Sequence, residues 1–235
     1  MLFRSSSKDH FYRWKRQNED DPEPSKDQPL LPILLKGMLD KARLLDIVEN
    51  FVLFDASEGS THKIVARNHQ YLGVNRVMAR LTSTDPTIRA EVAAGQLGVF
   101  WHTQGSGKSL SMVFFAHLIQ KYLESPTIVV ITDRNDLDDQ LFGQFTRCAK
   151  FLRQQAVQAE SRQNLKELLE GREANGIIFT TMQKFSDGDE PLCDRNNVIV
   201  MVDEAHRGQY GLTETIDENG KVSIGAARMV RRALP

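Results

Sequence analysis

A short run of two glycines, a lysine and two serines could bind the phosphates of a nucleotide. In Gly105–Ser109 the glycines would let the backbone turn its N–H groups inward, Lys108 could reach the terminal phosphates, and the Ser109 hydroxyl could bind Mg²⁺. A strict phosphate-loop pattern has glycine at the position of His102. The run nevertheless stands between an apolar, strand-like segment, Gly98–Trp101, and a helix-like segment. This context favours a phosphate loop over a plain glycine turn.

Two carboxylates follow a second strand-like run, Asn197–Val202. Asp203 could hold the Mg²⁺ of a bound nucleotide, and Glu204 could orient or deprotonate the attacking water. Acidic residues are also common at solvated ends of strands, which is the alternative interpretation. The phosphate loop upstream favours the catalytic interpretation, because two independent motifs then each stand in the context that they require.

Polar side chains also stand where a helix is predicted to begin and where strands are predicted to end. The Gln70 amide could pair with the edge of an adenine, although the same stretch suits a polar helix start. Arg134 follows one apolar run, and Thr180 and Thr181 close another. Ligands of parallel sheets bind at the carboxyl ends of the strands, so these three could hold the phosphates of a polymer. The alternative is that such residues cap the following helices.

The segments that would position these residues alternate between helix-like patterns and strand-like apolar runs. Apolar positions recur at helical spacing over 33–54, 68–81, 110–119, 133–150 and 161–171. Asp40 is placed to cap the second part of the first of these segments. Unbroken apolar runs at 98–101, 127–132, 176–181 and 197–202 are typical of strands that are covered on both faces. This alternation predicts an α/β fold with a parallel sheet.

Composition limits the class of protein. The chain has 235 residues and a formal net charge of −1, so bulk charge does not indicate nucleic acid. Residues 1–16 interleave cations and aromatics, which suits either stacking on nucleic acid or a short amphipathic helix. Cys148 and Cys193 have no metal-like spacing and suit a reducing cytoplasm. We expect no secretory signal and no membrane span, since no apolar run approaches the roughly 20 residues that a span needs.

Together these motifs resemble the motor of helicase superfamily two, and more narrowly the R (restriction and translocation) subunit of type I restriction enzymes. His102 is usual in the phosphate loop of that family. The stretches that carry the resemblance are Asn68–Asn75, Trp101–Ser109, Thr132–Gln140, Thr180–Gln183 and Asp203–Gly211.

The resemblance implies a three-layer, RecA-like parallel sheet with flanking helices, which is the first motor lobe of such proteins, and ATP and Mg²⁺ as cofactors. It implies that Lys108, Asp203, Glu204 and His206 are catalytic, with His206 coupling hydrolysis to motion. Ser109 and Asp203 would hold Mg²⁺. Nucleotide contacts are implied for Gln70 at the adenine and for Thr103, Gly105, Ser106, Gly107, Lys108 and Ser109 at the phosphates. DNA contacts are implied for Arg134, Thr180 and Thr181.

In the intact enzyme, ATP hydrolysis would move double-stranded DNA past the complex, and a nuclease domain would cut it as a type I site-specific deoxyribonuclease. Methyltransferase (M) and specificity (S) subunits would be partners. We assign residues 1–17 to the tail of the preceding nuclease domain, 18–32 to an acidic, proline-rich linker, 33–96 to a helical lead-in with the adenine motif, and 97–235 to the first lobe, incomplete at its C-terminus.

In that family the next strand, which lies between the phosphate-loop strand and the Asp-Glu strand, and the second lobe with its arginine finger would follow Pro235. An arginine finger contributes about 10³–10⁵ in rate. We therefore expect this chain to bind ATP–Mg²⁺ weakly and to hydrolyse it negligibly. Exposed strand edges would also make it poorly soluble.

Two other functions fit the same motifs. One is the lobe of a different superfamily-two DNA or RNA helicase, which a PD-(D/E)xK cluster upstream of Met1 would argue against. The other is a truncated, non-enzymatic fragment that binds only nucleotide or partner subunits. A Lys108→Ala change that left every activity of the parent protein intact would favour that second alternative.

Overall fold

The structure is a computed structural model that describes residues 12–55, 62–101, 103, 105–124, 126–132, 135–172, 174–185, 190–203, 215–216, 222–223 and 226–234. The chain forms two compact units, Met1–Leu118 and Ile119–Pro235, and each is considered by itself. Helix α5 (Lys108–Tyr122) begins in the first unit and ends in the second. Among these residues, none of the helices has the length and apolar character that crossing a membrane requires.

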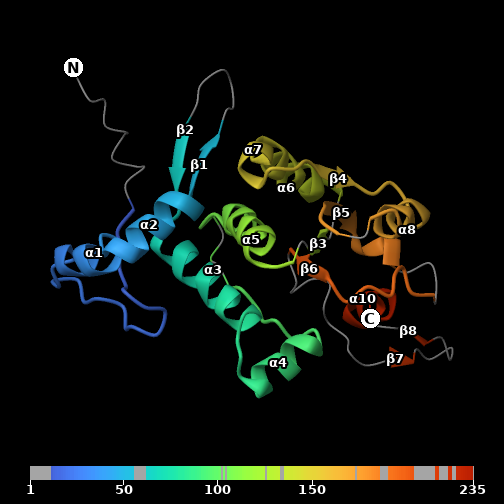
Figure 1. The fold of residues 1–235 in the computed structure, drawn as a ribbon, viewed down its shortest axis with the longest axis horizontal. Coiled ribbons are helices and arrows are strands. Elements are labelled where there is room, and N and C mark those ends of the chain that lie inside the picture. Colours follow the sequence, from blue (N-terminus) through green and yellow to red (C-terminus); the bar gives the residue numbers. More distant parts are fainter. Residues whose placement is uncertain are drawn as a thin grey trace. The chain divides into compact units, whose positions relative to one another are not determined.

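The first unit is built from helices and one hairpin (Figure 1). Its elements are α1 (Leu31–Gly37), α2 (Lys41–Asn50), β1 (Val52–Asp55), β2 (His62–Val65), α3 (Asn68–Leu81), α4 (Pro86–Ala93) and the start of α5. The Asp40 carboxylate accepts the N–H groups of Ala42 and Arg43, which confirms the predicted cap of α2. Helix α3 has its predicted bounds.

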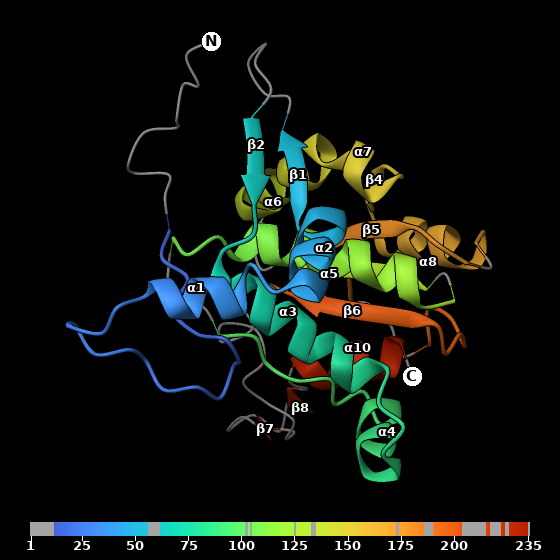
Figure 2. The same ribbon diagram turned by 60° about the vertical axis from the view of Figure 1, so that its left-hand side comes forward.

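The helix predicted over 33–54 ends early, because its last residues form β1. Val52 pairs with Val65, and the two strands run antiparallel side by side (Figure 2). Helical periodicity continued into this segment because Phe51 and Phe54 fall at helical spacing from the apolar positions of α2. Pairing with β2 makes this segment a strand, and the periodicity of one segment cannot show that a partner strand is available.

Aromatic rings in tilted and edge-on contact lie in the core of the first unit. The ring of Tyr71 on α3 lies 5.7 Å from that of Trp14 and 4.9 Å from that of Phe51. Phe51 in turn lies 5.4 Å from Phe114 on α5. Trp14 also packs so closely on Gly37 that a side chain at Gly37 would collide with it. Trp14, which precedes the predicted linker, is thus anchored in the core of the first unit.

A parallel four-stranded sheet organises the second unit. Its strands are β3 (Thr127–Thr132), β4 (Ala156–Gln158), β5 (Ile177–Thr181) and β6 (Val198–Val202), in the order β4-β5-β3-β6. The other elements are α6 (Asn135–Arg147), α7 (Ala149–Leu152), α8 (Arg162–Glu170), the 3₁₀ helix η2 (Met182–Phe185), the hairpin β7 (Thr215–Ile216) and β8 (Val222–Ser223), and α10 (Ala226–Ala233).

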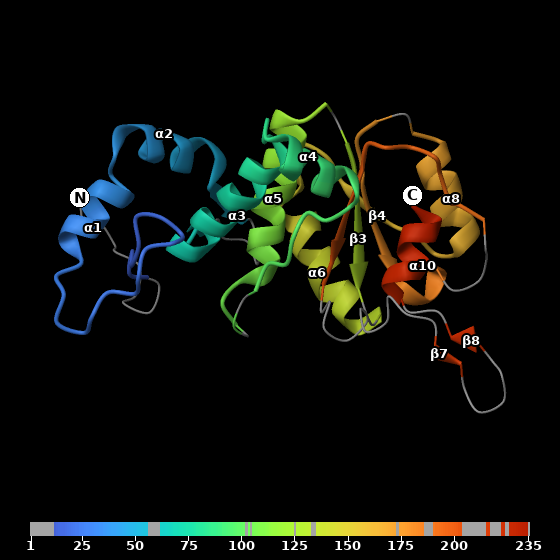
Figure 3. The same ribbon diagram turned by 90° about the horizontal axis from the view of Figure 1, so that it is seen from below.

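Helices cover both faces of this sheet (Figure 3). Val129 and Ile131 pack with α8 and α10. On the other face, the rings of Phe142 and Phe145 from α6 lie 5.3 and 5.1 Å from Phe179. Strands β3 and β5 are buried along their whole length, as their unbroken apolar runs predict. The predicted α/β class with helices flanking a parallel sheet is confirmed.

The prediction of a strand at Gly98–Trp101 is wrong. This segment is extended without strand pairing, and Val99 and Trp101 are each 84% exposed. A strand forms only against a neighbour, and the sheet order of the described residues ends at β6 with no partner for this segment. Phe100 still anchors the segment, because its ring lies directly against Gly73 of α3. Strand β4 was missed, since a three-residue run gives no periodic signal.

Candidate nucleotide site

The predicted phosphate loop forms a turn that leads into α5. The N–H of Ser106 donates to the carbonyl of Thr103 at 3.1 Å. The Gly107 carbonyl accepts from the N–H groups of Leu110 and Ser111, at 3.1 and 3.2 Å, in the first turn of the helix. Gly105 and Gly107 have φ values of +75° and +89°, a backbone region that side chains with a Cβ rarely enter. Both glycines are therefore required by the conformation of the loop.

Side chains at the start of α3 contact the carbonyl groups of this loop. Arg67 donates from its guanidinium to the Ser106 carbonyl at 3.3 Å, and the Nε2 atom of His69 lies 3.1 Å from the same oxygen. Gln70 donates from Nε2 to the Gly107 carbonyl at 2.9 Å. A carbonyl oxygen only accepts hydrogen bonds, so this contact places a proton on Nε2 of His69.

Gln70 has two structural contacts. Its Oε1 atom accepts the N–H of Arg67 at 2.8 Å, which caps α3, and its Nε2 atom binds the loop. The side chain is 1% exposed. Gln70 thus caps α3, which is the alternative role that the sequence left open. An amide has two hydrogens and two oxygen lone pairs, and these contacts with described residues use one of each. The adenine contact stays a prediction.

Electrostatics and packing around the loop favour a neutral His69. Partial desolvation lowers the pKa of His69 below its ordinary value, the hydrogen bond with Ser106 opposes this, and the nearby positive charge of Arg67 lowers it further. The guanidinium of Arg67 lies 3.6 Å from the ring centre of Tyr12.

Deeper in the unit, burial raises the pKa of Tyr71, and its hydrogen bond to the Asp46 carboxylate raises that pKa further.

The predicted catalytic residues are divided between the two units. Lys108 and Ser109 are half-buried at the start of α5 in the first unit. Asp203 directly follows β6 in the second unit, where it is half-buried and its N–H donates to the Ile131 carbonyl at 2.9 Å. Of the predicted residues outside the loop, the structure places Gln70 in contact with the phosphate loop. Three predicted site residues, Arg134, Glu204 and His206, lie outside the described residues, as does His102.

Thr180 and Thr181 end β5, as predicted, and both are buried. They are 0% and 3% exposed, respectively. The Thr180 hydroxyl has no hydrogen-bond partner among the described residues, while its carbonyl accepts from the Thr132 hydroxyl at 3.5 Å. Their position at the carboxyl end of a parallel strand suits a ligand. Their contact with DNA stays a prediction.

Arg67 and His69 were not predicted to touch the loop. The available signal was a row of hydrogen-bond donors, Arg67–Gln70, immediately before an apolar helical pattern. Within that row, the sequence predicts a binding role for the glutamine amide. Periodicity cannot show that the start of α3 meets a loop 37 residues away.

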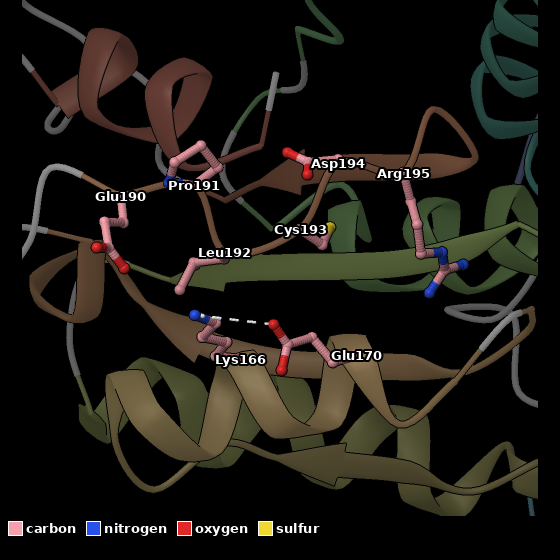
Figure 4. Close-up of a pocket in the computed structure, with 8 residues that line it drawn as sticks. All are labelled: Lys166, Glu170, Glu190, Pro191, Leu192, Cys193, Asp194 and Arg195. Atoms are coloured by element: carbon pink, nitrogen blue, oxygen red, sulfur yellow. Dashed lines mark ion pairs between the residues drawn. The ribbon is translucent and has the colours of Figure 1, made fainter.

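The second unit contains a cavity of about 500 Å³ (Figure 4). It lies between α8, which contributes Lys166 and Glu170 paired at 3.7 Å, and the segment Glu190–Arg195. That segment leads to the amino end of β6, whereas Asp203 follows the carboxyl end. The cavity contains none of the predicted site residues.

Comparison with known proteins identifies relatives over most of the chain. The SWI2/SNF2 ATPase family matches residues 69–235. The type I restriction enzyme HindI endonuclease subunit of Haemophilus influenzae is 47% identical over 215 residues, which are 87% of this chain and 20% of that protein. A candidate type I restriction enzyme endonuclease subunit, MjaIXP, of Methanocaldococcus jannaschii is 37% identical over 202 residues, which are 83% of this chain and 18% of that protein.

The chain thus spans about a fifth of the length of these two relatives. These comparisons confirm the resemblance to type I endonuclease subunits.

Proposed function

The chain belongs to the SWI2/SNF2 ATPase family, and from this premise we propose that it is the ATP-binding lobe of a type I restriction endonuclease (R) subunit. In the intact protein, ATP hydrolysis would drive translocation of double-stranded DNA before a nuclease domain cuts it. Methyltransferase and specificity subunits would complete the complex in the cytoplasm. The 47% identity to the HindI endonuclease subunit favours this over another superfamily-two helicase.

The conformation of the phosphate loop is the observation that carries the proposal. Two glycines with positive φ lead into α5, and the carbonyls of Ser106 and Gly107 are bound by side chains of α3. Peptide N–H groups point away from the carbonyl of the same peptide unit, so this arrangement suits an anion on the other side of the loop. The residues present therefore fit the phosphates of ATP.

Each predicted site residue has a role in this proposal. Lys108 would bind the terminal phosphates, with Thr103 and the loop amides beside them. Ser109 and Asp203 would hold Mg²⁺, which offsets the charge of the phosphates when bound. Glu204 would orient the attacking water, His206 would couple hydrolysis to motion, and Gln70 would contact the adenine. Arg134, Thr180 and Thr181 would lie along the DNA.

A binding titration tests the proposal on the 235-residue chain. We expect a fluorescent ADP or ATP analogue with Mg²⁺ to bind, and Lys108→Ala to weaken binding at least tenfold, since a charged contact to phosphate is lost. Lys121, exposed near the far end of the same helix, provides the matched control, and Lys121→Ala should bind like the unaltered chain. Equal binding by both variants would refute the assignment. Hydrolysis should be negligible, and strong DNA-stimulated hydrolysis by this chain would contradict that part.

A further inference from the structure

Three hydrogen-bonding side chains around the start of α3 hold two consecutive peptides of the phosphate loop. Arg67 and His69 bind the carbonyl of the Ser106–Gly107 peptide, and Gln70 binds that of the Gly107–Lys108 peptide. A trans peptide is planar, with its C=O and N–H on opposite sides. Fixing both carbonyls on the α3 side therefore turns the N–H groups of Gly107 and Lys108 to the side away from α3.

Tyr12 packs on one of these three side chains, that of Arg67. Its ring packs on the flat face of the Arg67 guanidinium, and the edge of that guanidinium donates to Ser106. Only a planar cation can use its face and its edge in this way, so a lysine would not replace it fully. Tyr12 itself is 56% exposed. The stretch that carries it is fixed to α3 by Asn68, whose side chain binds the backbone of Lys15 and Arg16 at 2.9–3.1 Å.

We propose that Arg67 and His69 are positioning residues for phosphate binding, which hold the Ser106 carbonyl on the α3 side of the loop, and that Tyr12 keeps Arg67 in place. The inference rests on the proposed function, because it assumes that the loop binds the phosphates of ATP. It gives the stretch before the predicted linker a direct connection to the nucleotide: a displacement of Tyr12 releases Arg67, and the loop carbonyl then loses a charged donor.

Arg76 provides a matched control for this role. It lies on α3 and also binds the N-terminal part of the chain, through an ion pair with Asp20 of the predicted linker at 3.2 Å, but its partner there is a side chain of the linker and not the loop. If Arg67 only helped to dock the N-terminal part of the chain, Arg67→Ala and Arg76→Ala would have similar effects. If Arg67 orients the loop, only Arg67→Ala changes the loop and its ligand.

The first measurement is made on the nucleotide-free 235-residue chain and does not depend on ATP binding. We expect the backbone amide NMR signals of Gly107 and Lys108 to shift in Arg67→Ala and in Tyr12→Ala. They should stay in place in Arg76→Ala and in Tyr12→Phe, which keeps the ring. Unmoved signals in Arg67→Ala would overturn the inference while leaving the proposed function intact.

The second measurement is the affinity for a fluorescent ADP analogue with Mg²⁺. We expect Arg67→Ala to weaken binding about tenfold, as a lost charge-assisted hydrogen bond does. His69→Ala and Tyr12→Ala should weaken it by a few fold, and Tyr12→Phe and Arg76→Ala should bind like the unaltered chain. A chain that binds no nucleotide refutes the proposed function. Binding that depends on Lys108 but is unchanged in Arg67→Ala refutes the positioning role alone.

Discussion

Arg67 and Arg195 both bind backbone carbonyls near the ends of elements, one in each unit, and they differ in how many partners they hold. Arg195, before β6, donates at 2.7–3.2 Å to four oxygens that come from α8, its following loop and the amino ends of β3 and β6. These are the carbonyls of Leu169 and Arg172, the Thr127 hydroxyl and the Asn197 side chain. All three nitrogens of its guanidinium are thus engaged.

Among the described residues, the guanidinium of Arg67 in the first unit makes one hydrogen bond to the loop, at 3.3 Å, and it also packs on the ring of Tyr12. An arginine with many partners fixes the start of a strand, because moving it breaks every bond at once. An arginine with one loop contact can release its carbonyl at a smaller cost. The difference separates a group that stabilises the sheet from one that can adjust a binding loop.

The largest expected effect is a loss of stability when Arg195 is replaced. Arg195→Ala leaves four oxygens without their donor, and we expect the free energy of unfolding of the second unit to fall by about 3 kcal/mol. Cys148 is buried in that unit, so its rate of labelling by a thiol reagent in urea measures the opening. Arg231, an exposed residue of α10, provides the control, and Arg231→Ala should change little. A loss below about 0.5 kcal/mol in Arg195→Ala would show that the four contacts do not stabilise the sheet.

A smaller effect is expected in the loop itself, where two glycines differ in their surroundings. A Cβ on Gly107 would lie 2.7 Å from Nε2 of Gln70, whereas one on Gly105 would meet nothing within 4 Å. Both substitutions introduce backbone strain of about 1–2 kcal/mol. We expect Gly107→Ala to weaken binding of the ADP analogue by more than tenfold and Gly105→Ala by less, in parallel titrations. The reverse order would mean that the contact with Gln70 does not shape the loop.

The smallest expected effect is a pH dependence at His69. Its pKa is lowered in the folded chain, so the unfolded chain takes up the proton first as the pH falls. The contribution of His69 to stability is therefore complete above its ordinary pKa of about 6.5 and declines below it. NMR titration of the ring should give a pKa below 6.5. The first unit contains both tryptophans, and acidification should lower its fluorescence-detected stability less in His69→Gln. A ring pKa at or above the ordinary value would contradict this.

Local patterns in the sequence determined much of the fold. The β-branched run of Thr127–Thr132 and the apolar run of β5 specify strands that must be covered on both faces, and Asp40 marks the start of α2. The phosphate loop also followed from sequence, because Gly105 and Gly107 supply the only residue type that adopts positive φ freely. Each of these features depends on residues that are adjacent or one helical turn apart.

Tertiary structure alone decided the remaining features. Gly98–Trp101 has the composition of a strand, but no described strand lies beside it to accept its hydrogen bonds. Gln70 caps its own helix and also binds Gly107, while Arg67 and His69 meet a loop that is far away in the chain. Such contacts leave no periodic trace, because α3, α4 and the segment after them separate the two partners along the chain. The sequence therefore specified which loop is expected to bind phosphate, and only the fold identified the side chains that hold the loop in position.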